Sequence, residues 1–268
     1  AYSFPILILG IAGIFNQTAD KILFPFLFED KEMANTQLGI YGACFKIAVV
    51  LVMFTQAFRY AYEPFIFAKN KDDDSKKSYS EAMKYFIIFA LLIFLAVMFY
   101  IDIFKHIVPA SYYPGLRVVP IVMLGELFFG IYFNLSFWYK LIDQTKWGAY
   151  FSTIGCVATI LIIVLFAPTY GYMACAWASF VSNLVMMLLS YFIGQKKFPI
   201  QYDLKSVITY SVLATVFYLA GMLPTIESEI LRLGYRTLLL CLFVGIVVKR
   251  DLPLGELPYV GRYFAKKK

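Results

Sequence analysis

Three charged residues inside long apolar runs are the first candidates for chemistry in this 268-residue chain. Asp20, Lys46 and Glu126 each stand in a largely apolar stretch. An ionisable side chain deep in a membrane helix costs about 2.5–3.5 kcal/mol, so it usually faces a charged partner or a wet cavity. A carboxylate there can carry a proton or a cation, and a lysine can hold a phosphate as a compact point charge. The structural alternative for all three residues is a buried ion pair between helices.

The spacing predicts that these residues share one depth. At a rise of 1.5 Å per helical residue, Asp20 and Lys46 lie roughly 12 Å inside the outer ends of their helices, and Glu126 lies roughly 15 Å inside. The helices of Asp20 and Lys46 follow each other in the sequence and must run antiparallel. We therefore expect the three charged groups to converge if their helices line a common cavity.

Further polar residues surround Asp20. Asn16 lies four residues earlier and shares its helix face, and Gln17 is related to Lys21 in the same way. Such a face is not compatible with lipid, so we expect Asn16 and Asp20 to line a cavity. For Lys21 we expect the long side chain to reach the headgroups at the outer surface.

A second charged motif lies nearer a helix end. Arg59 and Glu63 have the i, i+4 spacing of a helical salt bridge. We interpret them as an ion pair at the membrane interface, with the long arginine side chain reaching the polar layer. Pro64 follows directly, and we expect the helix to end there.

The elements that must position these residues are membrane helices. The chain is 61% hydrophobic and 15% charged, whereas soluble domains are about 45–50% apolar and about 25% charged. Crossing a hydrocarbon layer about 30 Å thick takes roughly 17–25 apolar residues. We predict an all-α, polytopic membrane helix bundle of about eight transmembrane helices, with a re-entrant pair as the alternative for the last two. The eight windows are 4–28, 38–62, 85–101, 116–139, 147–166, 172–192, 207–223 and 231–248.

The distribution of positive charge predicts the orientation. Most of the 24 Lys and Arg residues fall in alternate connections between the windows or in the C-terminal tail. Because cytoplasmic loops carry the excess of Lys and Arg, both ends of the chain are predicted to be cytoplasmic. The net charge of +7 is therefore interpreted as a topology signal, and no nucleic-acid partner is expected.

The residues needed for an enzyme or a metal centre are lacking. His106 is the only histidine, and the four cysteines lie in apolar runs without CxxC spacing. Neither a catalytic triad nor a zinc site nor a disulfide framework is supported. No GxxxxGK[ST] motif is present for nucleotide binding. We predict a protein that is not an enzyme and uses no cofactor and no metal. Because the chain begins at Ala1 without a signal peptide, we expect the start of a longer protein to be missing.

An ordered set of short motifs resembles polysaccharide flippases of the multidrug/oligosaccharidyl-lipid/polysaccharide (MOP) exporter superfamily. The resemblance covers essentially the whole chain. Its motifs are Leu38-Gly39-Ile40-Tyr41-Gly42 with Gln56, Phe58 and Pro64, then Gly130-Ile131-Tyr132-Phe133-Asn134-Leu135-Ser136, then Thr145-Lys146, and finally Pro168-Thr169-Tyr170-Gly171-Tyr172 with Ala174 and Ala176.

The resemblance implies a domain organisation and a function. Family members have two six-helix, MATE-like lobes, and polysaccharide branches carry two extra C-terminal helices. Residues 1–192 are then the C-terminal six-helix lobe, and residues 193–268 are two additional helices with a basic cytoplasmic tail, the N-terminal lobe being absent. The implied function is flipping of a lipid-linked (polyprenyl diphosphate) oligosaccharide across the bacterial cytoplasmic membrane by alternating access. Such transport serves export of surface polysaccharide such as O-antigen.

The resemblance also implies roles and partners. Lys46 is the candidate for the diphosphate headgroup, and Asn16, Asp20 and Glu126 are candidates for proton or cation coupling and for holding Lys46 in the empty site. Asn134 is a further candidate polar residue of the cavity. The implied partners are the lipid-linked oligosaccharide, membrane lipids, the missing lobe, and polysaccharide polymerase or assembly proteins. The two extra helices are expected either to form an apolar groove that binds the polyprenyl tail or only to pack against the rest of the bundle.

Three alternatives remain open at this point. A cation-coupled multidrug exporter of the same superfamily would favour an acidic cavity and no extra helix pair. A membrane glycosyltransferase or polysaccharide polymerase would need catalytic carboxylates or arginines, commonly on a large exported loop. A purely structural membrane subunit is the third alternative, and the polar face of the first helix argues against it.

Overall fold

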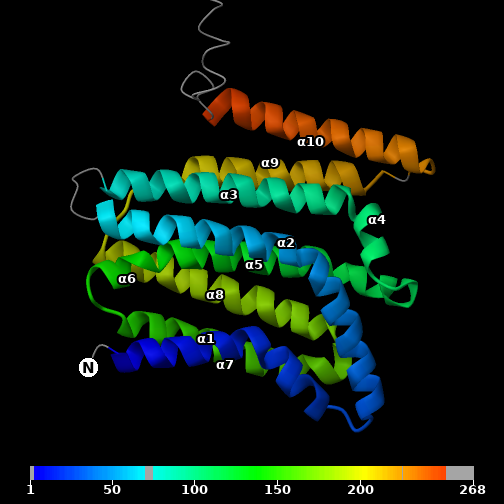
Figure 1. The fold of residues 1–268 in the computed structure, drawn as a ribbon, viewed down its shortest axis with the longest axis horizontal. Helices are drawn as coiled ribbons and strands as arrows, with labels where there is room; N and C mark the ends of the chain where they lie inside the picture. The colour runs from blue at the N-terminus through cyan, green and yellow to red at the C-terminus, as the bar shows by residue number, and fades with distance from the viewer. Residues whose placement is uncertain (1–2, 70–74, 225, 252–268) are drawn as a thin grey trace, which may run out of the picture.

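The computed structural model describes residues 3–69, 75–224 and 226–251, and in these residues it is all-α (Figure 1). Apolar membrane segments form helices because a helix satisfies every backbone hydrogen bond within itself. The helices are α1 (Ser3–Leu23), α2 (Lys31–Lys69), α3 (Ser75–Phe99), α4 (Ile101–Phe104), α5 (Val118–Leu135), α6 (Phe137–Leu141), α7 (Lys146–Tyr170), α8 (Met173–Lys197), α9 (Leu204–Met222) and α10 (Glu229–Asp251). Short 3₁₀ turns, η1 (Phe24–Phe26), η2 (Lys105–Ile107) and η3 (Ala110–Arg117), complete the connections.

Seven helical segments of the described residues are long and apolar enough to cross a membrane. They are α2, α3, the segment from η3 to α6, α7, α8, α9 and α10. The helix α1, predicted as a further span, has 21 residues but is not among the seven. Its second half contains the polar residues Asn16, Gln17, Asp20 and Lys21.

The helices lie side by side in layers (Figure 1). The helix α10 packs on α9 and α3, and α3 in turn packs on α2 and α5. The helix α5 packs along α8, α8 along α7, and α7 along α1. Helices α9 and α10 have 19 and 23 residues, and each is long and apolar enough to cross a membrane.

Successive helices alternate in direction, as the predicted topology requires. The end of α2, the start of α3 and the α6–α7 and α8–α9 connections lie at one end of the bundle, on the left in Figure 1. This end, called the basic end below, carries Lys76, Lys77, Lys140, Lys146, Lys196, Lys197 and Lys205. The α1–α2, α7–α8 and α9–α10 connections lie at the opposite end, which the topology prediction assigns to the outside and which is called the outer end below.

The helix α2 is longer than predicted at both ends. Asp30 starts it, because its Oδ1 accepts hydrogen bonds from the backbone N–H groups of Glu32 (2.9 Å) and Met33 (3.1 Å). The expectation that Pro64 ends the helix is wrong, since α2 continues to Lys69 with Pro64 inside it. A proline is tolerated inside a membrane helix when neighbouring groups satisfy the carbonyl that it leaves free.

Small residues let α5 and α8 approach closely. A Cβ atom at Gly125 of α5 would lie 3.2 Å from the backbone N and Cα of Phe180 on α8. The Asn183 side chain of α8 donates a hydrogen bond of 3.2 Å to the Gly125 carbonyl. The small residues Ala174, Ala178 and Ser182 of α8 are all buried. Tight backbone contact of this kind is a main source of helix association in lipid.

The α7–α8 turn depends on one glycine. Gly171 has φ +57°, and a Cβ atom there would clash with the side-chain oxygen of Gln37 on α2. The same Gln37 oxygen accepts a hydrogen bond of 3.2 Å from the backbone N–H of Tyr172. The turn therefore needs glycine both for its backbone conformation and for its contact with α2.

Candidate functional site

A polar cavity of about 230 Å³ lies among α1, α2, α5, α7 and α8. Five helices contribute lining residues, so the shape of the cavity depends on how these five helices pack together. Its lining combines two carboxylates, two amides, a lysine and hydroxyl groups with aromatic and aliphatic walls. The lining residues are Thr18, Asp20, Lys21, Tyr41, Phe45, Val52, Gln56, Glu126, Phe129, Thr159, Cys175, Ser179, Ser182 and Asn183.

Asp20 is the buried carboxylate of this cavity. Its residue surface is 9% exposed. The Lys21 backbone N–H donates to Asp20 Oδ1 at 2.9 Å, and the buried Tyr41 hydroxyl of α2 hydrogen-bonds to the Asp20 side chain. A buried carboxylate needs such donors, because an unpaired charge in an apolar interior is strongly unfavourable.

Glu126 brings a second carboxylate to the cavity from α5. It is half-buried, and among the described residues no side chain forms an ion pair with it. Hydroxyl oxygens from Thr159, Ser179 and Ser182 line the same space. Carboxylate, hydroxyl and amide oxygens are the ligands that hard cations prefer, and a carboxylate can instead take up a proton. The arrangement is therefore able to bind a small cation or a proton.

Lys21 supplies the positive charge of the cavity. Its side chain lines the cavity, and its Nζ lies 5.8 Å from the centre of the Phe45 ring on α2. Lys21 is also exposed, and the reach of its charged end to the outer headgroups stays a prediction. A long lysine side chain can line a cavity with its stem while its charged end stays in water.

Lys46 is placed elsewhere. It is exposed on α2, does not line the cavity, and has no ion-pair partner among the described residues. The expected convergence therefore holds for Asp20 and Glu126 and fails for Lys46. The reason is rotation about the helix axis: equal depth does not fix which face of α2 a residue occupies.

The spacing of residues in the sequence of α2 indicates which face of the helix lines the cavity. Tyr41, Phe45, Val52 and Gln56 line the cavity and are spaced by four, seven and four residues. This is the repeat of one helix face. Lys46 follows Phe45 directly and so lies about 100° away around the helix.

The two remaining candidates for cavity residues have different positions. Asn134 of α5 is buried outside the cavity. Its side-chain N–H donates to the Gly130 carbonyl at 2.9 Å, and its Oδ1 has no hydrogen-bond partner. The side chain of Asn16 lies outside the described residues.

Arg59 and Glu63 lie together toward the basic end of α2. Arg59 Nε is 3.7 Å from Glu63 Oε2. A third charge, which the sequence did not reveal, joins them: Lys140 Nζ of α6 is 3.0 Å from Glu63 Oε1. Both cations also lie over the Phe133 ring, Arg59 at 4.8 Å and Lys140 at 5.0 Å from its centre. Glu63 thus separates two like charges and ties α2 to α6.

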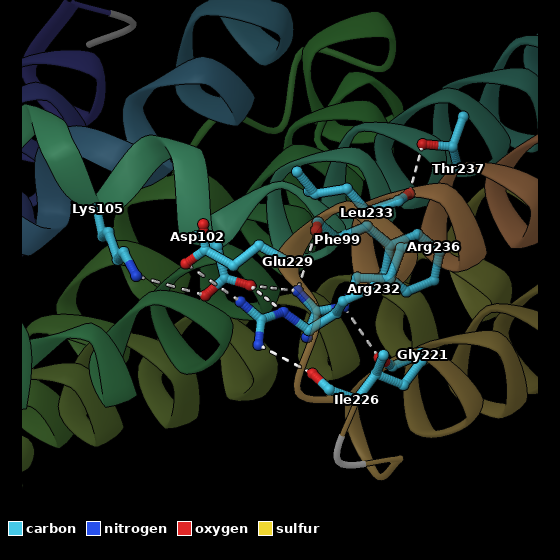
Figure 2. Close-up of polar contacts among 10 residues, drawn as sticks. All are labelled: Phe99, Asp102, Lys105, Gly221, Ile226, Glu229, Arg232, Leu233, Arg236 and Thr237. Atoms are coloured by element: carbon cyan, nitrogen blue, oxygen red, sulfur yellow. Dashed lines mark hydrogen bonds and ion pairs between the residues drawn. The ribbon is translucent and has the colours of Figure 1, made fainter.

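A further charged cluster at the outer end was not predicted (Figure 2). Arg236 of α10 is 5% exposed. Its Nη1 donates to Asp102 Oδ2 at 2.8 Å and to the Phe99 carbonyl at 3.2 Å, and its Nε donates to the Gly221 carbonyl at 3.0 Å. Arg232 Nε also lies 3.0 Å from Asp102 Oδ2. Arg236 thereby joins α10 to α4, α3 and α9 through one side chain.

Comparisons with known proteins identify a solved structure with a similar fold. No family model matches the chain, and no curated protein matches it. The helix order and arrangement nevertheless define a class of fold, because the chain is similar over most of its length to part of a solved membrane flippase.

That structure is the lipid II flippase MurJ in its inward closed conformation. The TM-score is 0.65 at 17% sequence identity, and the match covers 92% of this chain and 53% of MurJ. The chain thus spans about half the length of the flippase that it resembles. The comparison shows that the chain has the fold of about half of that structure, and its seven candidate membrane spans fit a multi-pass arrangement.

Proposed function

We propose that this chain is the C-terminal part of a flippase that moves a lipid-linked oligosaccharide across the bacterial cytoplasmic membrane. The observation that supports this most is the fold similarity to MurJ over 92% of the chain. The substrate class is a polyprenyl diphosphate that bears an oligosaccharide for surface polysaccharide. The mechanism is alternating access between two lobes, the general mode of transporters built from repeated halves.

The proposed domain organisation follows the packing. The helices α1, α2, α3, α5, α7 and α8 form the six-helix lobe of residues 1–192, and α9 and α10 with the basic tail form the addition of residues 193–268. An N-terminal lobe would meet the face that α1 and α2 leave uncovered. Ile14 of α1 (68% exposed) and Met53 of α2 (67% exposed) are large apolar residues left uncovered on these helices.

Lys46 remains the candidate for the diphosphate. It stands exposed on α2 without an anionic partner among the described residues, so its charge is free for a ligand. An ammonium group binds phosphate oxygens as an adaptable point charge, which suits a headgroup that changes position during transport.

The cavity containing Asp20 and Glu126 is the proposed site of ion coupling. It is separate from Lys46, so coupling and headgroup binding would use different surfaces of the same lobe. Binding of a proton or cation there would alter the packing of α1 against α2, α7 and α8. The ion would thereby bias the two access states.

A cation-coupled multidrug exporter is the second candidate, and the two carboxylates in the cavity are the observation that favours it. The pair α9–α10, packed on α3, favours the lipid flippase. A glycosyltransferase or polymerase has less support, because the fold resembles a transporter.

The leaflet in which the lipid-linked oligosaccharide accumulates tests the proposal. Cells depleted of the full-length protein should retain the lipid on the cytoplasmic side, and re-expression should restore export. Accumulation on the outer side, as expected for a missing polymerase, would contradict the proposal.

A further inference from the structure

The cavity proposed for ion coupling ends at a defined level on the side of the basic end. Toward that end, Gln56 is the last residue of α2 that lines the cavity, and Phe129 is the last one of α5. On α7 and α8 the corresponding residues are Thr159 and Asn183. The residues one turn further along these four helices therefore determine how the cavity is closed.

Apolar packing closes the cavity between α7 and α8. Gly155 lies four residues before Thr159, and α7 begins at the basic end. Met186 lies three residues after Asn183 on α8, which ends at the basic end. The Met186 side chain, which is 2% exposed, fills the space that a Cβ atom of Gly155 would occupy. An ion that passed between these two helices would have to cross this apolar contact, which is unfavourable.

An arginine closes the cavity between α2 and α5. Arg59 follows Gln56 by three residues on α2, and α5 has Phe133 four residues after Phe129. Both residues therefore stay on the helix faces that line the cavity. They contact each other, because the guanidinium carbon of Arg59 lies 4.8 Å from the centre of the Phe133 ring. The closure on this side thus consists of a charged group on an aromatic ring.

Two positive charges and one negative charge stand at this closure. Lys140 Nζ lies 5.0 Å from the centre of the same ring, and Glu63 lies 3.0 Å from Lys140 and 3.7 Å from Arg59. Among the described residues, no other carboxylate forms an ion pair with either cation, and the charged groups that act on Lys140 are Glu63 and Arg59. The charged trio of Arg59, Glu63 and Lys140 therefore has a net charge of +1, next to a cavity that holds two carboxylates.

The charge of Arg59 is only loosely balanced. Its Nε has no hydrogen-bond partner within the part of the chain that the structure describes, since 3.7 Å to Glu63 exceeds the length of a hydrogen bond. The side chains of Arg59, Glu63 and Lys140 are 41%, 31% and 22% exposed, so all three are partly shielded from solvent. Partly buried charges are screened by salt much less than charges on an open surface.

A fixed positive charge in a narrow passage raises the free energy of a cation there. Channels and transporters use such charges, often an arginine, to exclude cations and protons. A cation bound at Asp20 and Glu126 would meet the charged trio if it moved along α2 and α5 toward the basic end. The trio is therefore placed to oppose that movement.

We infer that Arg59 and Lys140, held together by Glu63, form an electrostatic seal between the ion-coupling cavity and the basic end. The seal keeps the coupling cation from crossing the lobe along α2 and α5, so the ion exchanges on the side of Lys21, the exposed residue of the cavity lining. An ion that crossed there would cross the membrane without moving the lipid. The inference rests on the proposed ion-coupling role of the cavity, and it gives the trio a function in coupling.

Passive cation flux through the purified full-length protein in liposomes tests the seal. The flux of Na⁺ and of protons is measured without any lipid-linked oligosaccharide. Arg59→Gln should increase the cation flux about tenfold or more over the wild-type protein, because it removes one positive charge from the closure. Lys140→Gln should act in the same direction. Arg59→Lys keeps the charge and should retain the low flux.

Glu63→Gln distinguishes the charge of the trio from its packing role. This substitution breaks the tie between α2 and α6 but makes the closure more positive, so the seal predicts a flux no higher than that of the wild-type protein. A flux as high as that of Arg59→Gln would show that the trio only holds the helices together, and would overturn the inference. Wild-type flux in both Arg59→Gln and Lys140→Gln would overturn it as well.

A double variant tests the route of the ion. R59Q/D20N should conduct less than Arg59→Gln alone, because the cation reaches the closure through the cavity of Asp20. Chloride flux should stay at the wild-type level in every variant, whereas a distorted protein that damages the bilayer leaks both ions. A leak that ignores Asp20→Asn, or that includes chloride, would contradict the seal. Since the assay contains no lipid substrate, its outcome is separate from that of the flippase test.

Discussion

Asp102 of α4 and Arg236 of α10 lie 2.8 Å apart, Oδ2 to Nη1, across 134 residues of sequence. The opposite end of α10 is held in a similar way, because Asp251 pairs with Lys84 of α3 and accepts a hydrogen bond from the Tyr210 hydroxyl of α9. The last helix is thus fixed to the bundle by ion pairs at both ends. Packing between lipid-facing helices lacks a hydrophobic driving force, so such polar ties carry a larger share of the association.

We predict that Asp102→Asn lowers the free energy of unfolding by about 2–4 kcal/mol, because it leaves the buried guanidinium of Arg236 without its carboxylate. Thermal unfolding of the detergent-solubilised protein measures this. Asp143→Asn, at an exposed position in the α6–α7 connection, is the matched control. Equal unfolding temperatures for the two variants would show that the outer cluster does not hold α10.

The close approach of α5 and α8 gives a second prediction. Gly125→Ala should destabilise the protein by about 1–3 kcal/mol, because the new Cβ meets the Phe180 backbone, which cannot move aside. Gly42→Ala is the control, since a Cβ atom at that position would have no other heavy atom within 4 Å. That substitution should be neutral or stabilising by up to about 1 kcal/mol through helix propensity. Similar losses at both glycines would argue against tight α5–α8 packing.

The cavity gives a third prediction, which separates ion coupling from a structural role. Asp20→Asn and Glu126→Gln should each reduce ion-dependent transport by about tenfold or more, a loss of about 1.4 kcal/mol in ion binding. The unfolding temperature should stay equal or rise, because each substitution removes a charge from a buried (Asp20) or half-buried (Glu126) position in an apolar interior. Glu32→Gln, at the exposed start of α2, should leave transport unchanged. A lower unfolding temperature with undiminished ion dependence would identify Asp20 and Glu126 as structural.

Lys46 gives a fourth prediction. Lys46→Ala in the full-length protein should reduce transport about 10- to 100-fold while the protein still inserts, because a charged hydrogen bond to the diphosphate contributes about 1.5–3 kcal/mol. Lys46→Arg should retain much of the activity. Lys31→Ala removes a lysine from the exposed outer end of the same helix and should have little effect. Unchanged surface polysaccharide in the Lys46→Ala strain would remove this residue from the headgroup site.

The helices could be predicted from the sequence, because a long apolar segment that crosses lipid satisfies its backbone hydrogen bonds by forming a helix. Seven of the predicted windows correspond to candidate spans, and the helix ends alternate as the lysine distribution indicates. The end of α2 was not predictable from Pro64 alone, because neighbouring groups decide whether a proline interrupts a membrane helix.

The site was only partly predictable. The rise per residue gave the depth of Asp20, Glu126 and Lys46 but not the rotation of each helix, so Lys46 was wrongly grouped with the two carboxylates. Arg236 lies inside the predicted window 231–248, but no role was predicted for it. Its partner Asp102 is distant in sequence, and no local spacing connects the two residues.

Transport by the purified full-length protein in liposomes is the decisive test of the flippase proposal. A fluorescent polyprenyl-diphosphate oligosaccharide is placed in both leaflets, and its accessibility to an external sugar-modifying enzyme is followed over time. We predict that the protein makes the inner pool accessible, and that Lys46→Ala slows this by about tenfold or more while Lys31→Ala does not. An inner pool that stays protected, in liposomes that contain correctly inserted protein, would contradict the assignment as a flippase.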